Sequence, residues 1–379
     1  MTTTDSDSGE GTPECGSCAL FLPSLVVGGA ERMMLNLATG LSERGCDVDI
    51  VLVRAEGAFL EDVPESVGVV DLSASRVLSA FPKLVRYLRK SNPDVLLSTI
   101  TPANVVAVWA SNSPGVDVRH VVRVARPESE AARVQDNTRK ERLTARLATW
   151  SYPSADEVIA ISEGVGDDLR SNTSLKDEQI HVVYNPVVTA DLETQASEPV
   201  DHPWFADPEP VVLGVGRLVD QKDFATLVRA FARLREKYPA KLIILGDGEK
   251  RDELRRVMAE LGVASDVELL GFTENPYKYM AHADVFVNSA KHEGFGNVIV
   301  EAMASGAPVV ATDCPGAPAE LLDHGTYGRL VPVGDPDAMA SAIDATLSDP
   351  TDPETLRERA DEFTLDAAVD VYRRILFDG

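Results

Sequence analysis

Lysine, cysteine and long apolar runs are all scarce in this sequence of 379 residues. Ten lysines accompany twenty-six arginines, and 61 acidic residues leave a net charge of -25. Such a charge excludes general binding to nucleic acid. The most apolar stretch, 95–110, is broken by Pro102 and is shorter than the ~20 residues of a membrane-spanning helix. Few lysines in an acidic chain also suit a halophile, so a cytoplasm of high salt is one compositional interpretation.

The four cysteines, at positions 15, 18, 46 and 314, are too few for a disulfide framework in a chain of this length. Cys15 and Cys18 form a CxxC pair, a spacing found in redox centres and in half of many zinc sites. No second pair or His follows at ligand spacing, so we interpret both as incidental thiols. The N-terminus lacks the features of a signal peptide, and we expect residues 1–17 to form a disordered acidic tail.

The length exceeds what one hydrophobic core supports, and apolar runs alternate with stretches of helical spacing, as in parallel α/β units. We predict an N-terminal Rossmann-like domain over 18–190, a linker over 191–209 and a C-terminal Rossmann-like domain over 210–364. A closing helix, 365–379, could pack on either domain, including back on the first. Strands are expected at 19–27, 47–53, 94–98, 119–124, 156–161 and 180–184, and again at 210–215, 240–245, 266–270, 284–288 and 308–312.

In parallel sheets, ligands bind beyond the carboxyl ends of the strands, and the loop after 210–215 carries two cations there. Arg217 and Lys222 lie five residues apart ahead of a predicted helix. A guanidinium, an ammonium and the amides of a helix N-terminus together suit a diphosphate leaving group. The alternative is that both cations pair only with surface carboxylates.

A second loop, after 284–288, sets glycines between two glutamates, Glu293 and Glu301. Its backbone amides can approach a ligand closely because glycine carries no side chain. Ionised carboxylates only accept hydrogen bonds, so beside a diphosphate they would meet hydroxyl groups of a sugar and a ribose. A capping glutamate and a solvated helix glutamate are the alternative. The loop residues proposed to contact the ligand are Gly294, Phe295, Gly296 and Asn297.

The sequence resembles the family 4 retaining glycosyltransferases, which have the GT-B fold, over residues 20–349. The resemblance is carried by GGAERMMLNLATGL, GVGRLVDQKDFATLVRAFARL, LIILGDGEKRDEL and ELLGFTENPYKYMAHADVFVNSAKHEGFGNVIVEAMASGAPVVATDCPG, in which Glu293 and Glu301 match an E-x7-E pattern. It implies an α/β protein of two Rossmann-like domains that face each other across a cleft. It also implies a nucleotide-sugar donor, which is a substrate, and no cofactor.

One stretch departs from the family pattern. Many relatives carry His-Asn or Ser-Glu-Arg-Asn where this chain reads Val-Ala-Arg-Pro-Glu over 124–128, so Arg126 is the candidate contact from the first domain. The resemblance implies these donor contacts: Arg217 and Lys222 on the diphosphate, Glu293 on the transferred sugar, Glu301 on the ribose, Gly28 and Gly29 against the phosphates, and Phe272 beside the nucleobase.

The resembling family keeps the anomeric configuration of the sugar. No carboxylate of the first domain is marked by a motif as a nucleophile, so we expect front-face departure in which the diphosphate helps to deprotonate the acceptor. Arg217 and Lys222 supply the charge, and we expect no metal. A nucleotide-sugar epimerase of the same architecture and a catalytically silent binding subunit remain alternatives.

Residues 119–146 hold eight basic and four acidic residues in a chain whose net charge is -25. A basic face there could meet an anionic lipid surface or a lipid-linked diphosphate sugar, whereas a salt-bridged helix is the alternative. We expect a cytoplasmic enzyme, at the inner face of the cell membrane in the lipid-contact interpretation. It would move a hexose or N-acetylhexosamine, UDP-linked, to a glycan or lipid-linked acceptor in cell-surface polysaccharide or glycoprotein glycan assembly.

Overall fold

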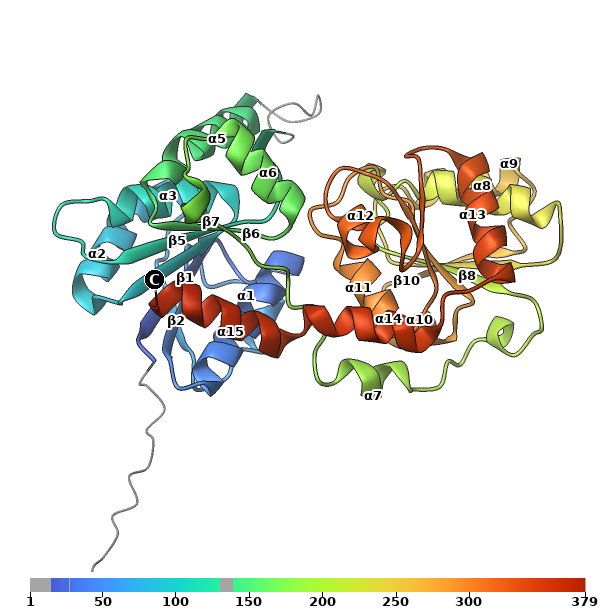
Figure 1. Ribbon diagram of the computed structural model, residues 1–379, viewed down its shortest axis with the longest axis horizontal. Helices are drawn as coiled ribbons and strands as arrows, with labels where there is room; N and C mark the ends of the chain where they lie inside the picture. Colours follow the sequence, from blue (N-terminus) through green and yellow to red (C-terminus); the bar gives the residue numbers. More distant parts are fainter. Residues whose placement is uncertain (1–14, 27, 130–138, 379) are drawn as a thin grey trace, which may run out of the picture. The chain divides into compact units, whose positions relative to one another are not determined.

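The computed structural model describes residues 15–26, 28–129 and 139–378, and it contains two parallel β-sheets with helices on both faces (Figure 1). Within these residues the first sheet has seven strands. Their spatial order is β3 (Gly68–Asp71), β2 (Asp47–Leu52), β1 (Ser17–Leu22), β4 (Val95–Thr99), β5 (Arg119–Val124), β6 (Glu157–Ala160) and β7 (Ile180–Val182).

The second sheet has six strands among the described residues. In space the order runs β10 (Val267–Gly271), β9 (Lys241–Leu245), β8 (Val211–Val215), β11 (Val285–Asn288), β12 (Val309–Thr312) and β13 (Arg329–Val331). In both sheets the strand order reverses beside the first strand, which is the doubly wound arrangement of Rossmann-like folds. The predicted α/β class is therefore confirmed.

The helices that connect the strands follow the predicted alternation. Along the first sheet they are α1 (Gly29–Glu43), α2 (Phe81–Ser91), α3 (Thr101–Ser111), α5 (Arg139–Ser151) and α6 (Glu163–Asn172). Along the second sheet they are α8 (Phe224–Arg235), α9 (Arg251–Glu260), α10 (Tyr277–His282), α11 (Asn297–Ala304), α12 (Pro318–Leu321), α13 (Pro336–Ser348) and α14 (Pro353–Ala360), and α15 (Leu365–Phe377) closes the chain.

Strands β1 and β9 are buried along nearly their whole length because helices cover both faces of each sheet. In β1, five consecutive residues from Cys18 to Leu22 are buried, and Leu242–Leu245 of β9 are buried in the same way. In the first sheet, Phe21 and Leu96 pack against Leu84 of α2 and Val106 of α3. This burial supplies the core on which the strand-end loops are mounted.

Several elements escaped prediction, among them α10, α12 and α14. Three others, β3, β13 and α6, are short or carry little apolar pattern. Strand β3 lies at the edge of its sheet with largely exposed side chains, and β13 is only three residues long. Helix α6 is polar, and it is begun by Ser162, whose side chain accepts a hydrogen bond from the amide of Val165 at 3.2 Å. The capping serine was the available sequence signal.

The segment 191–209, which the sequence predicts as a linker, carries short elements that pack on their neighbours. Leu192 and Ala196 of α7 (Leu192–Ala196) are buried. Asn275 donates a hydrogen bond to the backbone oxygen of Gln195 at 2.9 Å, and Lys241 lies 5.3 Å from the Trp204 ring. Loss of periodicity in the sequence therefore marks an irregular but docked segment.

The chain divides into two compact units. One runs to Arg123 and adds Ser154–Glu157 and the residues from Val369, whereas the other holds Val124–Pro153 and Val158–Ala368. Residues 1–14 of the predicted tail lie outside the described residues. The domain boundaries drawn from the sequence stay predictions.

The part of helix α15 from Val369 onward packs within the first unit. The carboxylate of Asp370 accepts from Arg44 at 2.8 Å, and the hydroxyl of Tyr372 accepts from Arg123 at 3.2 Å. Arg123 is 1% exposed and also donates to the hydroxyl of Thr99 at 3.1 Å. A charged residue of the predicted basic segment is therefore part of the interior.

The interpretation of Cys15 and Cys18 as two incidental thiols is wrong for Cys15. Cys15 forms a disulfide with Cys46, with 4.5 Å between their Cα atoms, whereas Cys18 is buried in β1. The pairing follows from the sheet, because β1 and β2 run side by side with Ser17 opposite Asp47. Burial raises the pKa of the Cys18 thiol, which suits a core residue.

Candidate functional site

Two loops carry most of the predicted site residues, and they follow the neighbouring strands β8 and β11. The backbone amide of Lys291 donates to the carbonyl of Gln221 at 2.8 Å, and the Gln221 side chain donates to the carbonyl of His292 at 2.9 Å. The hydroxyl of Ser289 donates to the carbonyl of Lys222 at 2.8 Å. These three bonds hold the loops together, so the residues they carry occupy defined positions.

Lys222 and Glu293 form an ion pair across the two loops. Their side chains are 18% and 7% exposed, so the pair is screened little by solvent. The side-chain amide of Asn288 also donates to Oε1 of Glu293, at 3.3 Å. Both contacts fall on Oε1, and Oε2 of Glu293 has no hydrogen-bond partner among the residues that the structure describes.

Asn288 also belongs to the site, although the sequence shows it only as the end of a strand. It is 5% exposed, and its side-chain oxygen accepts from the amide of Ala290 at 3.0 Å while its amide group points to Glu293. Asn288 therefore fixes both the start of the loop and the direction of the Glu293 carboxylate. The available signal was one polar residue at the end of the apolar strand VFVN.

The two predicted cations differ in their surroundings. Lys222 contacts Glu293, whereas Arg217 is exposed and its side chain makes no hydrogen bond or ion pair with any described residue. Among the described residues, the structure therefore does not support the alternative that Arg217 pairs with a surface carboxylate. Arg217 presents its guanidinium to solvent at the carboxyl end of β8, where an anionic ligand of a parallel sheet would lie.

Glu301 lies in α11, about one turn after its start. Although the residue is half-buried, loss of water around its carboxyl group raises its pKa to about 7, and the charge of Lys222 opposes this shift. Lys222 thus acts on both glutamates, and Glu301 changes its charge near neutral pH.

Glycines let neighbouring loops approach the site backbone. The amide of Glu293 donates to the carbonyl of Pro315 at 3.0 Å, and a Cβ on Gly316, whose φ is +120°, would lie 1.9 Å from the carbonyl oxygen of Glu293. In the same way, a Cβ on Gly246 would lie 2.0 Å from the carbonyl oxygen of Gly216. Any larger residue would push these loops away from the loops that carry Lys222 and Glu293.

The glycine loop offers backbone rather than aromatic surface. Gly296 begins α11 with a φ of +95°, and Asn297 is the first residue of the helix. Phe295 is 3% exposed and packs against Phe363, with 5.9 Å between ring centroids. Phe295 can therefore contribute only its backbone to a ligand, as can Gly294.

The remaining predicted contacts lie on other elements. Phe272 follows β10 and is 76% exposed, which leaves its ring available. Gly28 and Gly29 begin α1, in the first compact unit, and Arg126 is exposed after β5. The roles of all these residues toward a donor stay predictions.

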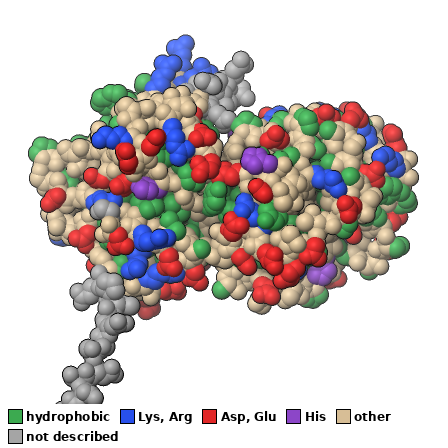
Figure 2. All heavy atoms as spheres, in the orientation of Figure 1, with side chains coloured by type: hydrophobic (Ala, Val, Ile, Leu, Met, Phe, Trp, Pro, Cys, Tyr) green, Lys and Arg blue, Asp and Glu red, His purple; other side chains and the backbone are tan. Residues whose placement is uncertain are grey.

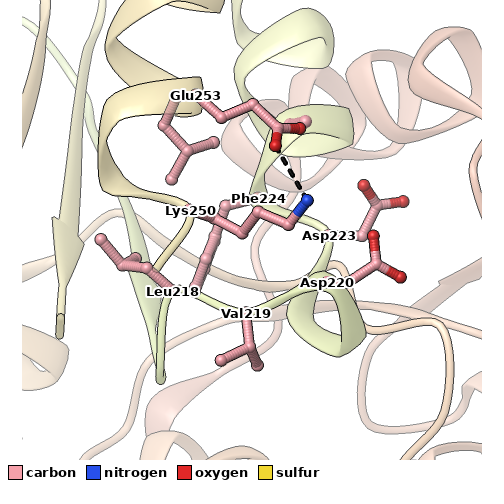
Figure 3. Close-up of a pocket in the computed structure, with 9 residues that line it drawn as sticks. Leu218, Val219, Asp220, Asp223, Phe224, Lys250 and Glu253 are labelled. Atoms are coloured by element: carbon pink, nitrogen blue, oxygen red, sulfur yellow. Dashed lines mark hydrogen bonds and ion pairs between the residues drawn. The ribbon is translucent and has the colours of Figure 1, made fainter. Parts of the chain in front are cut away.

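A small cavity beside the Arg217 loop is distinct from these contacts (Figure 3). Its volume of about 20 Å³ suits about one water molecule. Figure 3 shows Lys250 directed toward Glu253, with which it forms an ion pair of 2.8 Å, and the carboxylates of Asp220 and Asp223 at the other side. The cavity is too small for a nucleotide, so it flanks the candidate site.

Two family models match the chain, one on each half. The model described as Glycosyltransferase Family 4 matches residues 27–191, and the model described as Glycosyl transferases group 1 matches residues 209–349. The chain is also 30% identical to the lipopolysaccharide core biosynthesis glycosyltransferase LpsE of Rhizobium meliloti, over 92% of this chain and 96% of that protein. This chain is a glycosyltransferase of family 4.

Other comparisons agree with this membership. The glycosyltransferase is 31% identical to the N-acetylgalactosamine-N,N'-diacetylbacillosaminyl-diphospho-undecaprenol 4-alpha-N-acetylgalactosaminyltransferase of Campylobacter jejuni, over 87% of this chain and 90% of that one. Its structure is similar to that of Anabaena HepE in complex with UDP, with a TM-score of 0.77, 25% identity and coverage of 95% and 99%. The fold is GT-B, as the resemblance implies.

We predict that Asn288 acts on turnover through Glu293. In Asn288→Ala, Glu293 loses a hydrogen bond to a charged group, which is worth about 1.5–3 kcal/mol, so kcat should fall by roughly tenfold or more. Nucleotide affinity should stay within about twofold, because Glu293 is expected to contact the sugar rather than the nucleotide. Steady-state kinetics and calorimetry of nucleotide binding measure the two quantities. An equal loss of both would indicate a collapsed loop instead of a misdirected carboxylate.

Proposed function

We propose that this glycosyltransferase moves a hexose or N-acetylhexosamine from a UDP sugar, with retention of anomeric configuration, to a glycan or lipid-linked glycan. The observation that carries the proposal is the constellation of Arg217, Lys222 and Glu293 at the carboxyl ends of neighbouring strands. A free guanidinium and a paired ammonium suit a diphosphate, and the pair leaves one carboxylate oxygen for a sugar hydroxyl.

The names of the relatives support the donor and the acceptor. The structure of HepE holds UDP, and the name of the Campylobacter jejuni relative gives a diphospho-undecaprenol acceptor that carries sugars. LpsE is named for lipopolysaccharide core biosynthesis. By this likeness, the reaction belongs to cell-surface polysaccharide or glycoprotein glycan assembly.

In the proposed reaction, the bond between the anomeric carbon and the β-phosphate oxygen breaks, and the acceptor oxygen bonds to the same face of the sugar. The departing diphosphate takes the acceptor proton and so leaves as a nucleoside diphosphate. Arg217 and Lys222 stabilise the negative charge that grows on it. Glu293 orients the sugar through Oε2, because Lys222 and Asn288 hold Oε1. The side-chain cations fulfil the charge requirement in this scheme, and we propose that no metal is needed.

The proposed setting is the cytoplasm, at the inner face of the membrane where a lipid-linked acceptor would be presented. Among the residues that the structure describes, none of the helices combines the length and apolar character that crossing a membrane requires. Both matching family models describe glycosyltransferases, so we favour sugar transfer over the alternative of a nucleotide-sugar epimerase.

The donor is tested by thermal stabilisation with UDP, GDP and their hexose and N-acetylhexosamine conjugates. We expect UDP sugars to stabilise the protein most, by about 2.7 kcal/mol at 100 times the dissociation constant. Nuclear magnetic resonance of the transfer product then reports its anomeric configuration. Preferential stabilisation by GDP sugars would contradict the proposed donor, and an inverted product would contradict the front-face mechanism.

The diphosphate contacts are tested by Arg217→Ala and Lys222→Ala, each assayed with excess chelator. We expect kcat/KM to fall by roughly a hundredfold, as loss of a charge-assisted contact of ~3 kcal/mol implies. Arg255→Ala, which removes an exposed arginine of α9, should leave turnover unchanged.

Lys222→Ala also leaves Glu293 buried without its charged partner, which by itself destabilises a fold. The double variant Lys222→Ala and Glu293→Gln removes that penalty. It should recover melting temperature but not activity. If restored stability also restored near-normal turnover, Lys222 would be structural rather than a contact of the diphosphate.

Glu301 predicts a pH dependence of donor binding. With a pKa of about 7 in the free protein, it is mainly protonated at pH 6 and mainly ionised at pH 8, and only the ionised form accepts hydrogen bonds at both oxygens. The affinity for UDP-glucose should therefore rise by about fivefold to tenfold between these pH values. In Glu301→Gln, calorimetry should show weaker binding that does not change over this range. A parallel rise in both proteins would assign the effect to another group.

A further inference from the structure

Helix α5 exposes a stripe of alternating basic and apolar side chains. Arg139, Leu143, Arg146 and Trp150 follow one another at spacings of four, three and four residues, which places them on one side of an α-helix. All four are exposed, and Trp150 and Leu143 reach 75% and 58% exposure. We call these four residues the α5 stripe.

The opposite side of the helix is turned inward. Ala145 is 2% exposed, Ala148 is fully buried and Ser151 donates to the backbone oxygen of Leu147 at 2.7 Å. Small residues therefore fill the packed side, while the two large apolar residues point outward. A helix that packs on a core usually turns its large apolar residues inward. The packing of this helix therefore does not explain why Trp150 and Leu143 are exposed.

The structure also shows which basic residues of the predicted segment 119–146 are exposed and which are buried or paired. Arg119 donates to Glu157 and to the backbone oxygen of Ile375, both at 3.1 Å, and Arg123 is buried against Tyr372. These two arginines neutralise or bridge internal groups, so they cannot face a membrane. The residues 130–138 lie outside the described residues. Among the described residues, Arg126 and the α5 stripe remain exposed, and the stripe is the part that lies along one helix.

Charge and amphipathic character favour one partner for this surface. The stripe contains two arginines and no acidic residue, in a chain whose net charge is -25. Figure 2 shows Lys and Arg side chains gathered at the top of the view, over α5, beside hydrophobic surface. Tryptophan prefers the boundary between lipid headgroups and acyl chains, and arginine keeps its charge among the headgroups while its stem lies along apolar surface.

We propose that the α5 stripe lies on an anionic lipid surface, with Trp150 and Leu143 in the headgroup region and Arg139 and Arg146 against the lipid phosphates. This inference rests on the proposed function, because binding of the stripe to lipid would bring the protein to a lipid-linked acceptor. A helix of this length that lies in the interface gives reversible attachment rather than insertion.

Vesicle co-sedimentation tests the proposal with the full chain. The lipid probe is a set of vesicles of phosphatidylcholine and phosphatidylglycerol in equal parts, compared with pure phosphatidylcholine. Two variants divide the stripe by chemistry: Arg139→Ser with Arg146→Ser, and Leu143→Ser with Trp150→Ser. The control variant makes the same kinds of change on α9 and just beyond its end, at Arg255, Arg256 and Leu261, all of which are exposed.

The wild type should bind the anionic vesicles and bind neutral vesicles weakly. Each basic residue near such a surface is worth ~1 kcal/mol, so the arginine variant should bind about tenfold to thirtyfold more weakly. The apolar variant should also lose roughly tenfold or more, whereas the α9 control should match the wild type. Salt near 1 M, where the Debye length is about 3 Å, should abolish the difference between the wild type and the arginine variant.

Tryptophan emission provides a readout at the stripe itself. The chain has three tryptophans, and on anionic vesicles the emission of the wild type should shift to shorter wavelength as Trp150 leaves water. Trp150→Phe should bind with little change but lose the spectral shift, because the other two tryptophans lie outside the stripe. Quenching by lipids brominated on the acyl chain near the headgroup should follow the same pattern.

Equal vesicle binding by the wild type and both stripe variants would overturn the proposal. So would a concentration-dependent dimer in light scattering that disappears in the apolar variant, since a second copy would then be the partner of the stripe. Thermal stabilisation by the nucleotide-sugar donor should be unchanged in every variant of the stripe. Failure of vesicle binding with intact donor binding therefore rejects the membrane surface and leaves the proposed reaction standing.

Discussion

The candidate donor site depends on keeping two opposite charges together where water has little access. Lys222 and Glu293 come from different loops, and each would be costly to bury without the other. Their pairing therefore requires that the loops after β8 and β11 stay in register. The bonds from Ser289 and Gln221 across the loops, and from Asn288 to Glu293, meet that requirement with neutral groups.

The same requirement explains why glycines surround the site. The Lys222 loop and the Glu293 loop are each packed by a neighbouring loop at backbone distance, through Gly246 and Gly316. Both glycines also have a positive φ, which other residues rarely adopt. Lys222 and Glu293 are held by their contacts, whereas the side chain of Arg217 has no partner among the described residues.

Some basic residues of this acidic protein are concentrated at a few places. The net charge of -25 keeps most of the surface acidic, yet cations are concentrated where anions are expected. Arg217 and Lys222 stand at the strand ends, and the α5 stripe stands on a helix with no acidic residue on that face. Other arginines, such as Arg123, serve the interior and carry no information about ligands, although the sequence does not distinguish them from the exposed ones.

The sequence by itself determined the α/β class, most strands and helices, and the loops that carry the candidate donor residues, because burial of a sheet on both faces leaves clear apolar runs and glycine turns. Among the elements it missed are β3 and α6, whose apolar pattern is weak. Only the tertiary structure decided which side chains meet: Asn288 with Glu293, Cys15 with Cys46, and Arg123 with Tyr372. These contacts depend on which strands become neighbours in the sheet. The residues involved are far apart in the sequence, so their spacing along the chain does not predict that they meet.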